Sequence, residues 1–404
     1  MPGAPWRARD APGPEQERGV GWENGPVSVT PAEARIDLDA VRDNVAALRG
    51  RAAPAALMAV VKADGYGHGM VPAARAALAG GAHQLGVAHI AEALALRAAG
   101  LRAPVLAWLT TPGDRYADAV AADVELSAGA GWALDEIAHA ARTTGRAAAV
   151  HLKADTGLSR GGATPAEWPD LVAAAAKYEA DGVVQVVGVW SHLARADEPG
   201  HPSIARQLAA FGAALDQAAA AGLRPRLRHL ANSPATLTLP AARYDMVRPG
   251  LACYGLTPVP QLGPPATFGL RPAMTLLGRL AGVKRVPAGA GVSYGHTYVT
   301  DRETTLALVP LGYGDGVPRA ASSRAEVLLA GRRRRIAGRV CMDQFVVDLG
   351  DDAASPGDEA LLFGPGDAGE PTAQDWARLL DTISYEIVTR VGARVPRTYT
   401  GTGV

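Results

Sequence analysis

The sequence is poor in cysteine and in long apolar runs, and it carries no net charge. Its two cysteines, Cys253 and Cys341, lie far apart and in no metal-binding spacing. This excludes a disulfide framework and is typical of a reducing compartment, so we expect a cytoplasmic protein without a metal. Forty basic residues balance forty acidic ones, which removes the electrostatic case for binding nucleic acid. No apolar run approaches the roughly 18 residues of a membrane span, so we expect no membrane contact.

Lysine is also scarce. Of the 40 basic residues, four are lysines: Lys62, Lys153, Lys177 and Lys284. Lysine should remain where arginine cannot replace it, and a neutral amine that attacks an aldehyde is such a place, because a guanidinium stays protonated. Lys62 follows a buried-strand pattern at 57–61 and precedes a glycine-rich turn. It is therefore a candidate Schiff-base lysine; the alternatives are a lysine that reaches solvent or one that pairs with Asp64.

The glycines after Lys62 raise one alternative. Gly65, Gly67 and Gly69 separate the strand from a helix expected at 70–82, as the glycines of a dinucleotide-binding loop do. Their spacing is not G-x-G-x-x-G, and no acidic residue closes a second strand about 20 residues later. We therefore do not expect a dinucleotide site.

Strand and helix patterns alternate along the first two thirds of the chain. The apolar runs lie at 57–62, 84–89, 104–110, 123–127, 148–153, 183–190, 227–231 and 244–248. Amphipathic, alanine-rich segments separate most of them, for instance at 90–99, 131–144, 165–179 and 202–221, and a first helix is expected at 38–50. Eight regular units favour a closed α/β barrel of the (β/α)8 TIM type over a doubly wound sheet.

The sequence divides into three segments. Residues 1–30 are rich in proline, glycine and charge, which predicts a disordered N-terminal tail. Residues 31–270 form the predicted barrel, and residues 271–404 a mainly β C-terminal domain. Its strand patterns lie at 273–286, 304–311, 325–330, 336–349 and 359–363, with one helix at about 372–391. The basic cluster Arg332 to Arg335 is expected at the solvated tip of a hairpin.

Polar side chains follow five of the predicted barrel strands. They are Lys62, Lys153 with Asp155, His192, Asn232 with Ser233, and Arg248. The carboxyl ends of the strands carry the active site in such barrels, so we expect these side chains to lie together.

The last two barrel strands predict a phosphate site. Ser233-Pro234 is typical of an N-cap followed by proline at the first helical position. Arg248-Pro249-Gly250 follows the eighth strand, and loops after strands seven and eight often bind phosphate in this fold. A Schiff-base lysine and a phosphate site together indicate pyridoxal 5′-phosphate (PLP).

At this point the chain resembles the alanine racemases, PLP enzymes with a barrel and a β domain. The matching motifs are AVVKADGYGHG (59–69), LKADTGLSRGG (152–162), SHLARAD (191–197), ANSPAT (231–236), YDMVRPGLACYG (244–255), VSYGHTY (292–298), PLGYGDGVPR (310–319), GRVCMDQFVVDLG (338–350) and TISYEIVTRVGARVPRTY (382–399). They span roughly residues 33–400. The chain departs from the pattern at Gly314, where alanine is commoner, and at Cys341, where a small residue such as serine is usual.

The resemblance implies a two-base racemase. Lys62 would bind PLP and act as one base, and Tyr294, from the partner subunit of a homodimer, would act as the other. Arg248 would face the pyridine nitrogen, and Arg160 would position the substrate carboxylate. The residues implied for the phosphate are Tyr66, Ser233, Gly250 and Tyr385, and His192 is expected beside Arg248. Met342, Asp343 and Tyr313 are expected near the substrate. Lys153 corresponds to a lysine that some family members carry as a carbamate. For Lys153, an ordinary lysine paired with Asp155 is the alternative.

The implied substrate is alanine, and the product D-alanine would be expected to feed bacterial peptidoglycan, with an isozyme of secondary metabolism as the alternative. Broad-specificity amino-acid racemases and serine racemases share the architecture. A PLP-dependent decarboxylase is disfavoured because such enzymes usually place an acidic residue, not an arginine, at the ring nitrogen. A single-barrel PLP-carrier protein is disfavoured by the β domain with Tyr294 and Met342.

Overall fold

The computed structural model describes residues 30–401. The predicted disordered tail falls on residues outside this range, apart from Thr30, and stays a prediction. Residues 31–401 belong to one compact unit. None of the helices in the described range has the length and apolarity needed to cross a bilayer.

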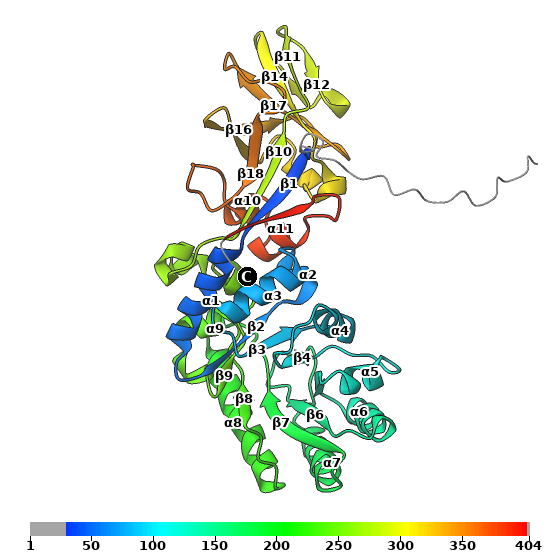
Figure 1. Cartoon of the computed structure of the whole chain (residues 1–404). Coiled ribbons are helices and arrows are strands. Elements are labelled where there is room, and N and C mark those ends of the chain that lie inside the picture. Colours follow the sequence, from blue (N-terminus) through cyan, green and yellow to red (C-terminus); the bar gives the residue numbers. More distant parts are fainter. Residues whose placement is uncertain (1–29, 402–404) are drawn as a thin grey trace, which may run out of the picture. The chain divides into compact units, whose positions relative to one another are not determined.

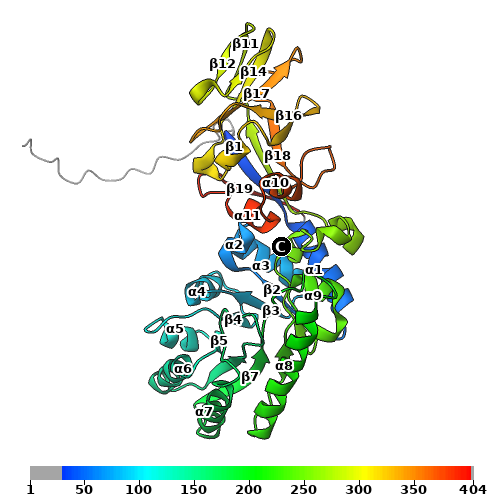
Figure 2. The same ribbon diagram turned by 180° about the vertical axis from the view of Figure 1, so that it is seen from behind.

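Eight parallel strands close into a barrel, as the sequence predicts (Figures 1 and 2). They are β2 (Ala56–Val60), β3 (Gln84–Val87), β4 (Val105–Ala107), β5 (Glu125–Ala128), β6 (Ala148–Lys153), β7 (Val184–Trp190), β8 (Leu227–His229) and β9 (Met246–Val247). Parallel strands are covered on both faces, so they read as continuous apolar runs rather than as alternating ones. β3, β4 and β5 are buried at every position.

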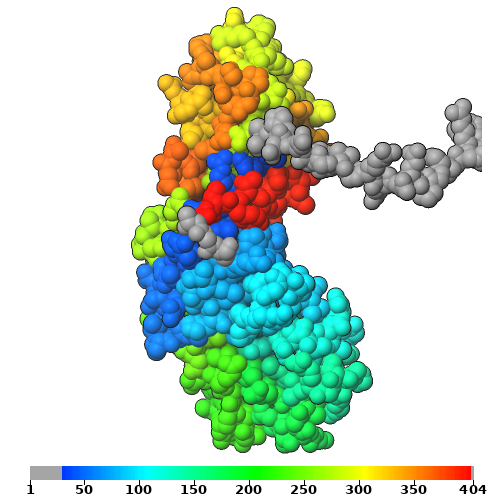
Figure 3. All heavy atoms as spheres, in the orientation of Figure 1, coloured from blue at the N-terminus to red at the C-terminus, as the bar shows by residue number. Residues whose placement is uncertain are grey.

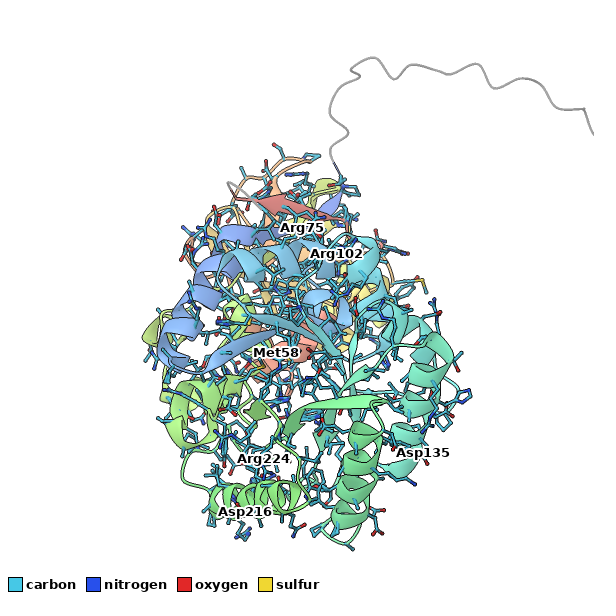
Figure 4. All side chains as sticks on the ribbon, turned by 60° about the horizontal axis from the view of Figure 1, so that its bottom comes forward. Met58, Arg75, Arg102, Asp135, Asp216 and Arg224 are labelled. Carbon is cyan, nitrogen blue, oxygen red and sulfur yellow. The ribbon has the colours of Figure 1, made fainter. Side chains whose placement is uncertain are left out.

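Helices surround the barrel. They are α1 (Leu38–Ala52), α3 (Met70–Ala79), α4 (Ile90–Ala98), α5 (Tyr116–Ala121), α6 (Gly131–Thr144), α7 (Trp168–Ala180), α8 (Pro202–Ala220) and α9 (Ser233–Thr238). Each longer helix buries one stripe: α6, for example, buries Leu134, Ile137 and Ala141. In Figure 4, Asp135 and Asp216 lie on the outer helices α6 and α8, whereas Met58 lies further in, on β2.

The second part of the fold is a nine-stranded sheet in the order β11-β14-β17-β16-β15-β18-β10-β1-β19. Its strands are β1 (Ala32–Asp37), β10 (Met274–Arg279), β11 (Gly282–Val286), β14 (Thr304–Val309), β15 (Glu326–Leu329), β16 (Arg332–Ala337), β17 (Phe345–Gly350), β18 (Glu359–Phe363) and β19 (Arg397–Thr400). A short ribbon, β12 (Gly291–Val292) with β13 (Tyr298–Val299), stands apart from it. The mainly β character of this part is confirmed.

Strand β1, near the start of the described chain, lies next to β19, near its end. It pairs antiparallel with β10 and parallel with β19, and Figure 3 shows the blue and red segments in contact. The predicted domain limits counted residues 31–37 with the barrel, but residues 32–37 lie in the sheet. The limits of the domains otherwise stay a prediction.

Two local predictions in the second part are wrong. The helix expected at about 372–391 is two short helices, α10 (Ala373–Leu379) and α11 (Ser384–Thr389), because Asp381 between them adopts a positive φ of 55°. The arginine cluster is not a hairpin tip but most of strand β16. The turn lies one step earlier, where Ala330 and Gly331 have φ values of 51° and 71°.

Asn44 ties α1 to the segment that follows the barrel. Its side chain is 2% exposed, donates to the carbonyls of Cys253 (3.3 Å) and Arg271 (2.9 Å), and accepts the N–H of Arg271 (2.8 Å). All three backbone groups would lose their partner in Asn44→Ala, and a buried unsatisfied group costs about 1–3 kcal/mol. We therefore expect Asn44→Ala to lower the free energy of unfolding by roughly 2–4 kcal/mol.

The measurement is the midpoint of urea unfolding at one fixed protein concentration. Ala46→Asn places the same side chain on the exposed face of α1 and serves as the control, with an expected loss of about 0.7 kcal/mol from helix propensity alone. Equal losses in the two variants would contradict a role for the buried amide.

Candidate active site

A cavity of about 730 Å³ opens at the carboxyl ends of the barrel strands. Nine of the predicted site residues line it: Lys62, Tyr66, Lys153, Arg160, His192, Ser233, Arg248, Gly250 and Tyr385. The first eight follow strands or loops of the barrel, and Tyr385 comes from α11. The structure thus brings together residues that are distant in sequence, while their individual roles stay predictions.

The chain turns with left-handed geometry directly after Lys62. Ala63, Asp64, Gly65 and Tyr66 have φ values of 52°, 52°, 61° and 53° within the short element α2 (Lys62–Tyr66). Non-glycine residues adopt this conformation at a cost of roughly 1–2 kcal/mol each. Side chains hold the turn: the carboxylate of Glu92 accepts the N–H of Ala63 at 2.7 Å, and that of Asp64 accepts the N–H of Met70 at 2.8 Å. Strain held in place by surrounding structure is a frequent property of functional sites.

The amine of Lys62 is half-buried in the cavity wall. Burial lowers its pKa, and the nearby guanidinium of Arg160 lowers it further. Asp64, considered above as its ion-pair partner, accepts a backbone N–H instead. A lowered pKa makes the neutral, nucleophilic amine available closer to neutral pH.

Lys153 and Arg248 lie against the ring of Trp190. The Nζ of Lys153 is 4.6 Å and the Cζ of Arg248 is 4.8 Å from its centroid, so one indole contacts two cations. Burial, Arg160 and Arg248 lower the pKa of Lys153 to about 8. Asp155 raises the pKa of Lys153 from a distance but forms no close ion pair with it, and an oxygen of that carboxylate accepts the N–H groups of residues 157–159.

A second wall of the cavity offers hydrogen-bond donors to an anion. The Oγ of Ser233 accepts the N–H groups of Gly250 at 2.9 Å and of Ala252 at 3.3 Å, which leaves its own O–H free to donate. Burial raises the pKa of Tyr66 and raises that of Tyr385 to about 12, so both phenols keep their protons. Any Cβ at Gly250 would clash with the hydroxyl of Tyr66, so only glycine lets the backbone and this phenol converge.

The predicted cap of the following helix is wrong by one residue. Asn232, not Ser233, is the N-cap of α9, and its side chain accepts the N–H of Ala235 at 3.2 Å. Ser233 is the first helical residue, because the amide oxygen of Asn232 already accepts a backbone N–H of the first helical turn. The hydroxyl of Ser233 is thereby directed to the loop at Gly250.

Arg248 is buried beneath the cavity. Its Nη2 donates to the carbonyl of Ser191 at 2.7 Å and lies 3.4 Å from the Nδ1 of His192, and its Nη1 lies 3.2 Å from the Nδ1 of His229. Burial lowers the pKa of Arg248 to about 9. Burial and the neighbouring cations, Arg248 first, hold the pKa of His192 well below its usual range, so this imidazole is neutral.

The sequence analysis missed His229, which contacts Arg248, and the buried groups behind it. A usable signal was present, because the apolar patterns at 123–127, 148–153 and 227–231 each contain an ionisable residue where a buried parallel strand should be apolar.

The remaining predicted residues lie elsewhere. Tyr294, Tyr313, Met342 and Asp343 are not among the described residues that line the cavity. Tyr294 is 72%, Met342 53% and Tyr313 45% exposed. Their side chains are therefore available for contacts with a second molecule.

Backbone hydrogen bonds hold part of this second group in one cluster. The N–H of Tyr313 donates to Cys341 at 3.0 Å, and that of Gly314 donates to Met342 at 2.8 Å. Asp343 pairs with Arg394 at 2.8 Å. Among the described residues, no three His, Cys, Asp or Glu side chains are grouped as a metal ion would require.

We expect Lys153 to react with an acylating reagent at a pH where ordinary lysines are protonated. With its pKa lowered to about 8, about half of the amine is neutral near pH 8. Its rate of acetylation, followed by peptide mass spectrometry, should therefore level off just above that pH. Lys177 on α7 reports the reagent's own pH dependence, and four lysines make the peptide assignment simple.

Two variants of Arg160 test whether its charge lowers the pKa of Lys153. Arg160→Ala removes the largest charge contribution and should move the midpoint upward, whereas Arg160→Lys keeps the positive charge and should leave it near its original value. An unchanged midpoint in Arg160→Ala would show that the two cations do not interact.

Comparison with known proteins agrees with this geometry. The family models for the alanine racemase N-terminal and C-terminal domains match residues 36–258 and 273–399. The alanine racemase of Frankia casuarinae is 67% identical over 366 residues, which are 91% of this chain and 95% of that protein. That of Thermobifida fusca is 65% identical over 92% of this chain and 98% of its own. The crystal structure of alanine racemase from Streptomyces lavendulae superimposes with a TM-score of 0.92, with 60% identity over 93% of this chain and 98% of that one. The chain belongs to the alanine racemase family, which confirms the resemblance in the sequence.

Proposed function

We propose that this member of the alanine racemase family interconverts L-alanine and D-alanine with PLP as its cofactor. We further propose that it acts as a homodimer in which each cavity is completed by the partner subunit. The observation that carries the proposal is the convergence of a half-buried lysine of lowered pKa with a built anion cradle in one cavity.

The residues of the cavity fit PLP. The cofactor has an aldehyde, a phosphate, a phenolic oxygen and a ring nitrogen, and when bound it makes the α-hydrogen of an attached amino acid acidic. Lys62 would hold the aldehyde. The O–H of Ser233 and the phenols of Tyr66 and Tyr385 would hold the phosphate. The missing Cβ at Gly250 leaves the space in which these donors converge.

Two bases on opposite faces of the α-carbon would move the proton. The neutral amine of Lys62 accepts or returns it on one face, and the phenol of Tyr294 from the partner does so on the other. A phenol with an ordinary pKa of about 10 is a weak base at neutral pH, so it needs nearby positive charge. Arg160 on the cavity wall supplies such charge and would also bind the substrate carboxylate.

Arg248 would act as a hydrogen-bond donor to the ring nitrogen. The guanidinium would keep its proton and so offer the ring nitrogen a hydrogen bond rather than a proton. This would limit the negative charge that the ring can take up and favour return of the proton to the α-carbon, which would suppress transamination. An acidic residue at this position, usual in the decarboxylases, would have the reverse effect.

The partner subunit would contribute its Tyr294, Tyr313, Met342 and Asp343 to each cavity. Tyr294, Tyr313 and Met342 are solvent-exposed in the single chain, as a dimer interface requires. In this arrangement Met342 would border the carboxylate site through its backbone, with Asp343 supporting it through the ion pair with Arg394. Tyr313 would narrow the entrance.

Purified protein with L-alanine in deuterated water should form D-alanine that carries deuterium at the α-carbon. Enantiomer composition and α-deuterium are followed together, with and without added PLP. L-serine run in parallel measures how strictly the substrate is alanine. Bound cofactor without D-alanine would keep the cofactor assignment and direct attention to other amino acids, whereas the absence of both would refute the role of Lys62.

A hybrid dimer tests whether Tyr294 acts across the interface. Lys62→Ala and Tyr294→Phe chains with different affinity tags are co-expressed, and the hybrid is purified through both tags. It contains one intact site of two, so we expect about half of the wild-type activity, although each variant homodimer is nearly inactive.

The control hybrid combines a wild-type chain with a chain that carries both substitutions. It has no intact site if Tyr294 acts across the interface, and one intact site if the tyrosine acts within its own chain. Activity in the control hybrid but not in the first hybrid would therefore contradict the proposed arrangement.

A further inference from the structure

A line of buried polar side chains runs through the barrel interior to Arg248. It consists of Gln84 on β3, Glu125 on β5, His151 on β6 and His229 on β8, none of them more than 7% exposed. Gln84 and Glu125 are the first residues of their strands, and Arg248 follows the last residue of β9. The line therefore extends from the amino-terminal ends of the strands to the rim of the cavity.

Each member of the line contacts the next. The Nη1 of Arg248 lies 3.2 Å from the Nδ1 of His229, whose Nε2 lies 2.8 Å from the Nδ1 of His151. The Nε2 of His151 lies 2.8 Å from the Oε2 of Glu125, which also accepts the amide of Gln84 at 2.5 Å.

These contacts allow one arrangement of protons. Arginine can only donate, so the Nδ1 of His229 must accept. A neutral imidazole carries one proton, so His229 carries it on Nε2 and donates it to the Nδ1 of His151. His151 then carries its own proton on Nε2 and donates it to Glu125. A doubly protonated His151 would force the proton of His229 onto Nδ1, opposite the N–H of Arg248.

Charges at the two ends agree with this arrangement. Burial alone would raise the pKa of Glu125, but the hydrogen bond from His151, the charge of Arg226 and the hydrogen bond from Gln84 hold the pKa below the usual value, so Glu125 is a carboxylate. Burial and Arg248 hold the pKa of His229 well below its usual range, so it is neutral. Arg226 reaches the other carboxylate oxygen at 3.5 Å and stands outside the line.

Neighbouring residues fix both imidazoles in place. The ring of Trp190 stacks on His229 with an angle of 1° and a centroid distance of 5.8 Å, and its Nε1 donates to the Oγ of Ser127 at 2.9 Å. On β7, a Cβ at Gly188 would clash with the Nδ1 of His151, so the glycine reserves the space of that ring.

We propose that Glu125 is a positioning residue for Arg248: through two neutral histidines, it keeps an accepting nitrogen opposite the guanidinium and balances its charge across the barrel. The inference rests on the proposed function, in which Arg248 faces the ring nitrogen of the cofactor. Hydrogen bonds in such a chain strengthen one another, so the carboxylate at the far end makes the Nδ1 of His229 a better acceptor.

The first test is the tautomeric state of the histidines in the wild-type protein, with and without PLP. Selective ¹⁵N labelling of histidine and long-range ¹H–¹⁵N correlation report which nitrogen carries the proton. We expect both His151 and His229 to carry a single proton, on Nε2, with and without PLP. A proton on the Nδ1 of His229, or two protons on His151, would overturn the proposal without any variant.

The second test compares two substitutions of Glu125. Glu125→Leu removes the acceptor, and Glu125→Gln keeps an accepting oxygen. For Glu125→Leu we expect kcat for alanine to fall on the order of tenfold, as is typical when an outer hydrogen-bond partner of a functional histidine is lost. KM should stay nearly unchanged. The Nε2 proton of His151 should exchange faster with solvent. Glu125→Gln should recover most of kcat and keep both tautomers. Equal kcat in the two variants would contradict the proposal.

The outcomes separate this inference from the proposed function. A wild-type protein that makes no D-alanine refutes the function, while the tautomers still report on the line of residues. An active wild-type protein with the wrong tautomers refutes the inference alone. If Glu125→Leu does not fold, Gly188→Ala displaces His151 directly and should show the same loss in kcat and the same change in its Nε2 proton.

Discussion

Positive charge gathered around one cavity is the constraint behind this site. Four cationic side chains, those of Lys62, Lys153, Arg160 and Arg248, line the cavity, and all except Arg160 are at least partly buried. Glu92 raises the pKa of Lys62 and Asp155 raises that of Lys153, but burial and the neighbouring cations outweigh both carboxylates. Partly desolvated charge of one sign is unfavourable unless protons are lost or an anion binds. The amines lose basicity, Trp190 contacts two of the cations, and the cavity suits a ligand with a phosphate and a carboxylate.

The sequence was sufficient for the barrel and for much of the site. Buried parallel strands leave uninterrupted apolar runs, so eight strands could be counted, and their carboxyl ends carried Lys62, Lys153, His192, Ser233 and Arg248. The scarcity of lysine drew attention to Lys62 without any comparison. Such reasoning could not place Tyr294 and Met342, because the local sequence of a turn does not show whether its side chains contact another molecule.

The failures share a physical origin in long-range pairing. Strand β1 was missed because its partners, β10 and β19, lie far along the chain, and the pattern at 32–37 alone is too short to show that it belongs to a sheet. The arginines of β16 read as a loop, although Arg334 reaches Asp352 and Arg333 donates to the carbonyls of Gly369 and Glu370. His151, His229 and Glu125 were passed over because they lie inside the predicted strands, whereas the site residues were taken from the strand ends.

Strand β19 ties the turn after Lys62 to a part of the chain far beyond the barrel. The barrel strands end at Val247, but Arg397 donates to the carbonyl of Gly67 at 3.0 Å, and a Cβ at Gly69 would clash with the hydroxyl of Tyr399. A chain shortened before residue 397 would keep all eight barrel strands but would lack these contacts to the turn after Lys62.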